Sequence, residues 1–92
     1  MDNGKFFEKD GKKLLNDNQI KDIIFSDNIY ETLVRDPKLK TSFWPFLQID
    51  KDKNILDAFC SCKTGEKQGF CEHLSAAFFY ITKKNEPIHV RF

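Results

Sequence analysis

Apolar residues occur in short stretches separated by polar turns, a pattern typical of a chain with several strands and one amphipathic helix. Residues 19–26 combine isoleucines and a phenylalanine with a following Ser-Asp-Asn turn, so they predict a strand. Residues 43–49 predict another strand, with Pro45 at an edge or near the start because proline has no N–H for the ladder. A polar turn at 50–54 then leads to a strand over residues 55–61.

Two segments fit more than one type of structure. Residues 4–15 place apolar pairs around a polar stretch in which Gly11 suggests a turn, so they fit two short strands or one frayed helix. Residues 29–35 fit a strand that pairs back in a hairpin, or a helix capped by Asn28. The Asp-Pro pair at 36–37 ends either element.

Residues 72–83 predict the clearest helix, because apolar side chains recur at i, i+3, i+4 and i+7. This stripe consists of Leu74, Ala77, Phe78 and Ile81. Phe79 and Tyr80 lie outside it, so they are either buried as well or part of a surface that meets a partner. Residues 88–92, which follow a Glu-Pro pair, fit an edge strand or a link to a larger protein.

Strand alternation predicts a sheet that is apolar on both faces. In the strand at 55–61, Ile55 and Phe59 are expected to point to one face. The residues expected on the opposite face, against the helix stripe, are Leu56, Ala58, Cys60 and Cys62. A sheet of this kind needs a cover on each side. The C-terminal helix supplies one cover, and residues 1–40 are expected to supply the other.

The chemistry-bearing residues are three cysteines and a histidine within fourteen residues: Cys60, Cys62, Cys71 and His73. Zinc takes four thiolate or imidazole ligands in a tetrahedron, and this set supplies four. Cys60 and Cys62 leave one side of a strand end. Cys71 and His73 would diverge within a regular helix, so Cys71 is expected before the first turn and His73 just inside it.

Other roles for these residues remain open. The three cysteines could be inert buried thiols, Cys60 and Cys62 could form a strained redox pair, and Cys71 with His73 could form a nucleophile dyad. Their odd number and close spacing favour metal over a disulfide framework. Four protein ligands leave no open position on zinc, which argues against metal catalysis. His89 fits an ordinary surface or strand histidine.

Charge and hydropathy limit the partners. The formal net charge is +1, and a zinc ion on three thiolates would bring it to about zero. Phosphate binding therefore needs a local basic patch, for which Lys63, Lys67, Lys83 and Lys84 are candidates; the alternative is a solvated lysine fringe. No apolar stretch reaches membrane-spanning length and the N-terminus lacks a signal-peptide layout, so we expect a cytosolic or nuclear protein.

At the four candidate ligands the chain resembles the SWIM zinc-finger family, whose pattern is CxC, a variable gap and CxH on a β-β-α unit. The N-terminal half resembles the region that precedes this finger in bacterial Swi/Snf-type helicase-like ATPases. That wider resemblance involves Gly11, residues 20–25, Ser26 and Tyr30, although Phe25 stands where that family has the glycine of a Gly-Ser turn. The resemblance implies zinc-dependent folding and binding of DNA or protein.

We therefore expect one α+β domain: a small antiparallel β-sheet with a zinc-stabilised β-β-α unit over residues 43–84, a C-terminal helix, and a tail or linker at 85–92. The expected function is a non-catalytic zinc module that contacts DNA, protein or both, as part of a larger Swi/Snf-type ATPase. No GxxxxGK[ST] motif and no small-molecule site are indicated. The alternative is a protein-interaction module that docks on its own ATPase or another partner. Expected contact residues are Lys63, Lys67, Phe79, Lys83 and Lys84.

Overall fold

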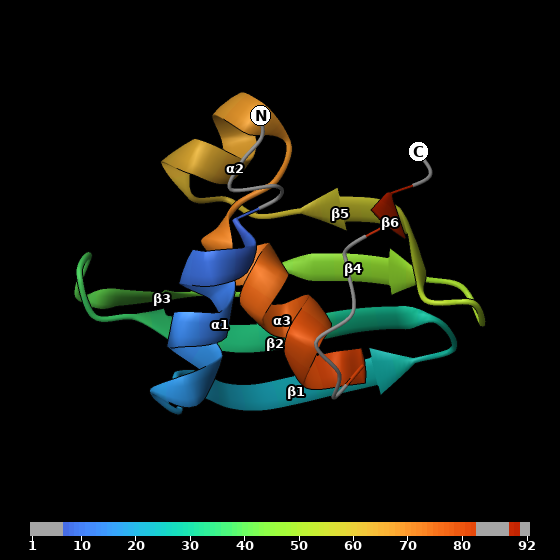
Figure 1. Cartoon of the computed structure of the whole chain (residues 1–92), viewed down its shortest axis with the longest axis horizontal. Helices are drawn as coiled ribbons and strands as arrows, with labels where there is room; N and C mark the ends of the chain where they lie inside the picture. Colours follow the sequence, from blue (N-terminus) through green and yellow to red (C-terminus); the bar gives the residue numbers. More distant parts are fainter. Residues whose placement is uncertain (1–6, 83–88, 91–92) are drawn as a thin grey trace.

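The computed structural model describes residues 7–82 and the backbone of residues 89–90. Two helices, α1 (Glu8–Asn16) and α3 (Glu72–Thr82), lie side by side on the same face of a six-stranded sheet (Figure 1). A third, shorter helix, α2 (Lys63–Gln68), connects the end of the sheet to α3. The fold class is α+β, as the sequence predicted.

The sheet contains all the strands of the described chain. These are β1 (Ile20–Ser26), β2 (Ile29–Asp36), β3 (Thr41–Phe43), β4 (Phe46–Ile49), β5 (Asn54–Phe59) and β6 (His89–Val90). Their spatial order is β1-β2-β4-β5-β6, with β3 also paired to β2. All pairs are antiparallel except β5 with β6, which is a short parallel pair at the edge. Pro45 falls in the gap between β3 and β4, where no ladder donor is needed.

The structure decides between the alternatives that the sequence left open. Residues 29–35 form a strand that pairs with β1 as a hairpin, and Thr32 and Val34 alternate inward to full burial. The N-terminal segment forms a helix that runs through Gly11 without a turn. A Cβ atom at Gly11 would lie 2.8 Å from the backbone nitrogen of Ala76, so glycine permits the close contact between α1 and α3.

The alternation predicted for the strand at 55–61 is wrong at one end. Phe59 points away from the helices as expected, but Ile55 is fully buried on the helix side together with Ala58, which pairs with Leu47. The cause is an irregularity in the pairing of β4 with β5, where Gln48 faces Asp57 while Ile49 faces Ile55. A single extra residue reverses the face of every side chain beyond it.

The prediction that residues 1–40 cover the second face of the sheet is also wrong. Their strands β1 and β2 belong to the sheet itself, and their helix α1 lies beside α3 on the same face (Figure 1). As a consequence, α3 packs on α1 and over β1, β2 and β4, rather than mainly on Leu56 and Ala58. Phe79 is 1 % exposed because α1 covers it, with the Lys12 ammonium 5.1 Å from its ring centre.

Candidate metal centre

Cys60 and Cys62 are placed by the link between the sheet and α2. Cys60 directly follows β5, and Cys62 is the N-cap of α2, where its Sγ accepts a hydrogen bond from the backbone N–H of Gly65 at 3.2 Å. A Cβ atom at Gly65 would lie 2.6 Å from the carbonyl oxygen of Cys60, so only glycine permits this tight loop. From the sequence, the two glycines of residues 63–70 predict a tightly closed loop; the structure shows the short helix α2 within it.

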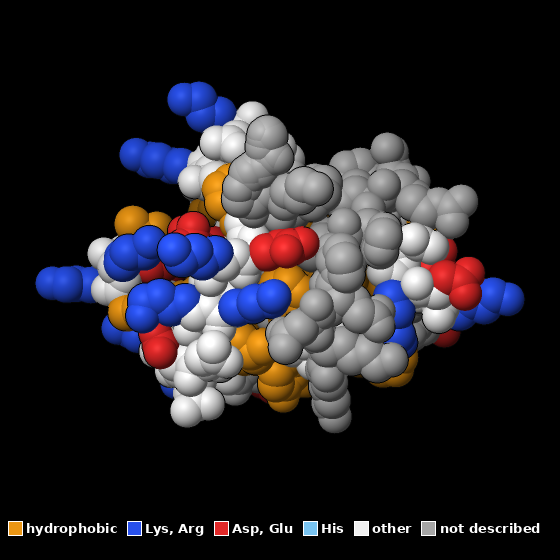
Figure 2. Space-filling view, in the orientation of Figure 1, with side chains coloured by type: hydrophobic (Ala, Val, Ile, Leu, Met, Phe, Trp, Pro, Cys, Tyr) orange, Lys and Arg blue, Asp and Glu red, His pale blue; other side chains and the backbone are white. Residues whose placement is uncertain are grey.

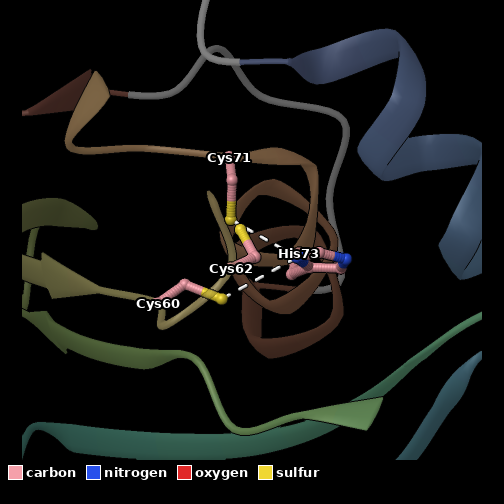
Figure 3. Close-up of side chains that lie close together, drawn as sticks. All are labelled: Cys60, Cys62, Cys71 and His73. Carbon is pink, nitrogen blue, oxygen red and sulfur yellow. Dashed lines mark hydrogen bonds between the residues drawn. The ribbon is translucent and has the colours of Figure 1, made fainter. Parts of the chain in front are cut away.

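Cys71 and His73 lie on either side of the start of α3, as the sequence predicted. The carbonyl oxygen of Cys71 accepts the N–H of Ser75 at 3.1 Å, which makes Cys71 the residue before the first helical turn. His73 is the second residue of the helix, and its ring points back toward the sulfurs (Figure 3). The free N–H groups at this helix start favour the thiolate form of a nearby cysteine.

The four side chains converge on one point (Figure 3). Their ligand atoms all lie within 4.8 Å of one another, and all four residues are buried. His73 Nδ1 is 3.7 Å from the Sγ of Cys60 and 3.6 Å from the Sγ of Cys71. A tetrahedral zinc with Zn–S near 2.3 Å and Zn–N near 2.0–2.1 Å requires S···N separations of about 3.6 Å. The cluster therefore has the dimensions and donor types to hold one zinc ion.

A fifth residue, Asp36 at the end of β2, orients the histidine. Its Oδ2 lies 2.7 Å from His73 Nε2, and both side chains are 2 % exposed. Its other oxygen, Oδ1, accepts the backbone N–H groups of Lys38 and Leu39 at 2.9 and 3.3 Å, so the carboxylate is held from both sides. The ring of Phe43 packs on the imidazole at a centroid distance of 4.6 Å. This arrangement directs Nδ1 to the sulfurs.

The three thiols of the cluster have different pKa values, because they interact with one another and are buried. A hydrogen bond from Cys71 lowers the pKa of Cys60 to about 4, against the opposing effect of burial. The same pairing with Cys60, together with burial, raises the pKa of Cys71. Burial also raises the pKa of Cys62. In the folded cluster these shifts favour a thiolate at Cys60 and thiols at Cys62 and Cys71, and all three cysteines are free of disulfides.

The histidine and the aspartate stabilise each other's charge. Burial alone would lower the pKa of His73, but its hydrogen bonds with Cys60 and Asp36 raise it above the usual value. Burial would likewise raise the pKa of Asp36, yet the hydrogen bonds from His73 and from the Leu39 N–H hold it below the usual range. Asp36 is therefore a carboxylate, which is the acceptor that a metal-bound histidine needs at its second nitrogen.

A cavity of about 370 Å³ adjoins the cluster, and Cys62, Cys71 and His73 form part of its lining. Its lining also includes Asp36, Leu39, Phe43, Lys63 and Glu72. Lys38 lies 3.6 Å from Glu72, an ion pair between the β2–β3 turn and the first residue of α3. The turn that follows Asp36 is thus tied to α3 by a second contact beside the cluster.

The residues expected to meet a partner lie in different environments. Lys63 and Lys67 are exposed on α2, close to the metal cluster. Phe79 is not a surface residue, because α1 buries it, and the expectation that it contacts a partner is wrong on that ground. Tyr80, its neighbour, is 38 % exposed. Lys83 and Lys84 lie outside the described residues.

Comparison with known proteins gives one match. Residues 46–81 match the family model described as the SWIM zinc finger, which spans β4, β5, α2 and nearly all of α3. No curated protein and no solved structure matches the chain. Asp36 and Phe43, which hold the histidine, lie outside the matched segment. Over residues 7–82 no helix combines the length and apolarity needed to cross a bilayer.

Proposed function

Residues 46–81 form a SWIM zinc finger, and from this we propose that the chain is a structural zinc module that contacts DNA, protein or both and performs no catalysis itself. The convergence of four buried protein ligands carries this proposal, with Cys60, Cys62, Cys71 and His73 as the zinc ligands. When bound, zinc supplies a crosslink between the end of β5 and the start of α3. A tetrahedral ion with four protein ligands has no position left for substrate or water.

The nucleophile alternative is disfavoured by access and protonation. Asp36, His73 and Cys71 do lie in the order acid, histidine, thiol, with 2.7 and 3.6 Å between successive polar atoms. A nucleophilic cysteine, however, must be accessible and largely ionised. Cys71 is fully buried, and its pKa is raised rather than lowered. These properties suit a metal ligand that loses its proton on binding the ion.

Lysines on one side of the molecule support a contact with the phosphate backbone of DNA. Figure 2 shows Lys and Arg side chains gathered over α1 and beside α2. The lysines of these helices are Lys9, Lys12, Lys13, Lys63 and Lys67. The same helices carry Glu8, Asp10 and Glu66, so the five lysines leave a modest local excess of positive charge, which favours backbone binding although the net charge is only +1. Lys63 and Lys67 belong to the short helix that Cys62 caps, so the metal would fix their position.

The setting of the module is part of the proposal. The resemblance of residues 11–30 to the region before the finger in Swi/Snf-type helicase-like ATPases supports a place in such a larger protein. In that setting the module contacts nucleic acid or docks on the ATPase, and the catalysis belongs to other residues. A module that binds protein alone is the second candidate, favoured by the near-neutral net charge.

Titration with DNA at two salt concentrations distinguishes the two candidates. We expect the zinc-loaded protein to bind duplex or single-stranded DNA, and the affinity to fall steeply as salt rises. Substitution of both Lys63 and Lys67 by glutamine is expected to reduce the slope of log K against log salt by up to about two. The matched control replaces Lys51 and Lys53, which are exposed in the β4–β5 turn. No binding to either form of DNA at low salt would favour the protein-interaction module.

A further inference from the structure

The sheet has a second face that the described helices do not cover. Both α1 and α3 lie on one side of it (Figure 1). On the opposite side, strand pairing forms a continuous row across four strands, in which Ile24 faces Glu31, Glu31 faces Phe46, and Phe46 faces Phe59. We call these four residues the outer row. Its two ends are strongly exposed, Ile24 at 54 % and Phe59 at 56 %.

Alternation along the strands shows that the outer row points away from the core. Thr32 and Leu47, the next residues after Glu31 and Phe46, are fully buried under the helices. Successive side chains of a strand point to opposite faces, so Glu31 and Phe46 point outward. Each residue of the row lies directly opposite the next, and such cross-strand neighbours have Cβ atoms about 5 Å apart. The row is therefore one connected surface.

Glu31 stands in the middle of this apolar row, between Ile24 and Phe46. Within the described part of the chain its carboxylate forms no ion pair. A second carboxylate, Asp57, lies opposite Gln48 on β4, two residues before Phe59 on the same face. The surface thus carries Glu31 at the centre of its apolar row and Asp57 at its margin, and the nearest cation on the outward face of β2 is Arg35, four residues beyond Glu31.

We propose that the outer row is a docking surface for a protein segment that presents an arginine or lysine within an apolar face. Any partner that covers Ile24 and Phe46 must also cover Glu31, because Glu31 lies between them. Burying a carboxylate without a counter-charge is costly, so a purely apolar partner is disfavoured. A cation opposite Glu31 removes this cost and adds a charge-assisted hydrogen bond. Glu31 and Asp57 repel the phosphate groups of nucleic acid, which are expected to bind instead at the lysines of α1 and α2.

The probe is a pair of synthetic amphipathic helical peptides that share one leucine-rich face and differ in a single central residue, Arg or Glu. We titrate each into the zinc-loaded, isotope-labelled protein and follow the backbone amides by NMR. The Arg peptide is expected to shift amides of β1, β2, β4 and β5, and to bind at least about tenfold more tightly than the Glu peptide. Glu31→Gln is expected to remove most of this preference while keeping the shape of the side chain.

Two surface variants distinguish binding at the outer row from nonspecific binding to any exposed apolar side chain. Phe59→Ser is expected to weaken both peptides. Tyr80→Ser, at an exposed residue (38 %) of α3 on the opposite side of the sheet, is expected to leave both unchanged. Zinc stoichiometry and amide dispersion confirm that each variant is folded, since both positions are at the surface.

Three outcomes would overturn the proposal. The two peptides could bind equally, or the shifted amides could lie on α1 and α2. The protein alone could also dimerise through the row, seen by sedimentation equilibrium and abolished by Phe59→Ser, which would assign the face to a second copy of the chain. None of these results depends on DNA binding, so the failure of this proposal and of the DNA contact are distinguishable.

Discussion

Asp36 provides the sharpest test of the metal centre, because its two oxygens have different partners. Oδ2 accepts a hydrogen bond from His73 Nε2, and Oδ1 accepts the N–H groups of Lys38 and Leu39. The side-chain amide of the Asp36→Asn variant would have one oxygen and one NH2 group. Whichever way the amide turns, its NH2 group faces a donor, either the imidazole N–H or the two backbone N–H groups. The substitution keeps the shape and cannot keep both sets of bonds.

The size of the effect follows from the bond that is lost. A hydrogen bond to a charged group contributes about 1.5–3 kcal/mol, and here the Nε2–Oδ2 distance is 2.7 Å between side chains that are 2 % exposed. Loss of the partner that orients a ligating histidine typically lowers metal affinity about 10–100-fold, which is about 1.4–2.7 kcal/mol. We therefore expect Asp36→Asn to weaken zinc binding by one to two orders of magnitude.

The assay is competition for zinc with a chromophoric chelator at pH 7, with helix content recorded for each metal-free and zinc-loaded protein. Asp50→Asn is the matched control. Its Oδ1 also accepts two backbone N–H groups, those of Asp52 and Asn54, at 2.9 Å each, but it lies in the β4–β5 turn away from the cluster. An affinity loss for Asp36→Asn that is no larger than the loss for Asp50→Asn would refute the orienting role of Asp36.

Two further predictions concern the ion itself. Removal of zinc by a chelator, or Cys71→Ser, is expected to unfold at least residues 55–82, because a structural site contributes on the order of 10 kcal/mol to folding. Circular dichroism and amide dispersion measure this loss, and a metal-free protein with unchanged helix content would contradict it. Zinc binding at pH 7 is expected to release at least two protons, because Cys62 and Cys71 are thiols before the ion binds. In the folded cluster their pKa values are raised, and in an unfolded segment a cysteine has its ordinary pKa of about 8.5. Below the pKa values of the two thiols, the zinc affinity therefore falls about hundredfold for each unit by which the pH falls. Calorimetry in buffers of different ionisation enthalpy counts the released protons. Release of one proton or none would contradict the assignment of Cys62 and Cys71 as thiols that ionise when they bind zinc.

The ligand set could be predicted from the sequence because its four residues lie close together along the chain. Four donors within fourteen residues, with a spacing that no single helix can satisfy, require a strand end and a helix start to meet. The strands at 19–26, 43–49 and 55–61 and the helix from residue 72 were also predicted, because their apolar patterns have clear periods, but the structure divides the segment at 43–49 between the end of β3 and the whole of β4. The edge strand at residues 89–90 was expected as one of two alternatives.

The features that sequence analysis missed depend on contacts between distant segments. Asp36 is 37 residues from His73, and an aspartate before proline signals only the end of an element. Helix α2 has no apolar stripe; its cap is a cysteine whose sulfur accepts the N–H of Gly65. Gly11 resembles a turn until the neighbouring helix is known, because the reason for glycine is the backbone of Ala76. The irregularity in β5 also has no local signal.

The position of Asp36 makes the metal centre larger than the finger. The matched segment begins at residue 46, yet the carboxylate that holds His73 comes from β2, and Phe43 of β3 packs on the same ring. Strand β2 also carries Glu31, and Cys60 directly follows Phe59, the last residue of β5. Zinc therefore holds the two ends of the region that supports the outer row: β2 through Asp36 and His73, and β5 through Cys60. Loss of zinc is therefore expected to weaken both proposed contacts: protein binding at the outer row and DNA binding at the lysines of α1 and α2. Asp36→Asn should weaken zinc binding without changing the charge or side chains of either surface.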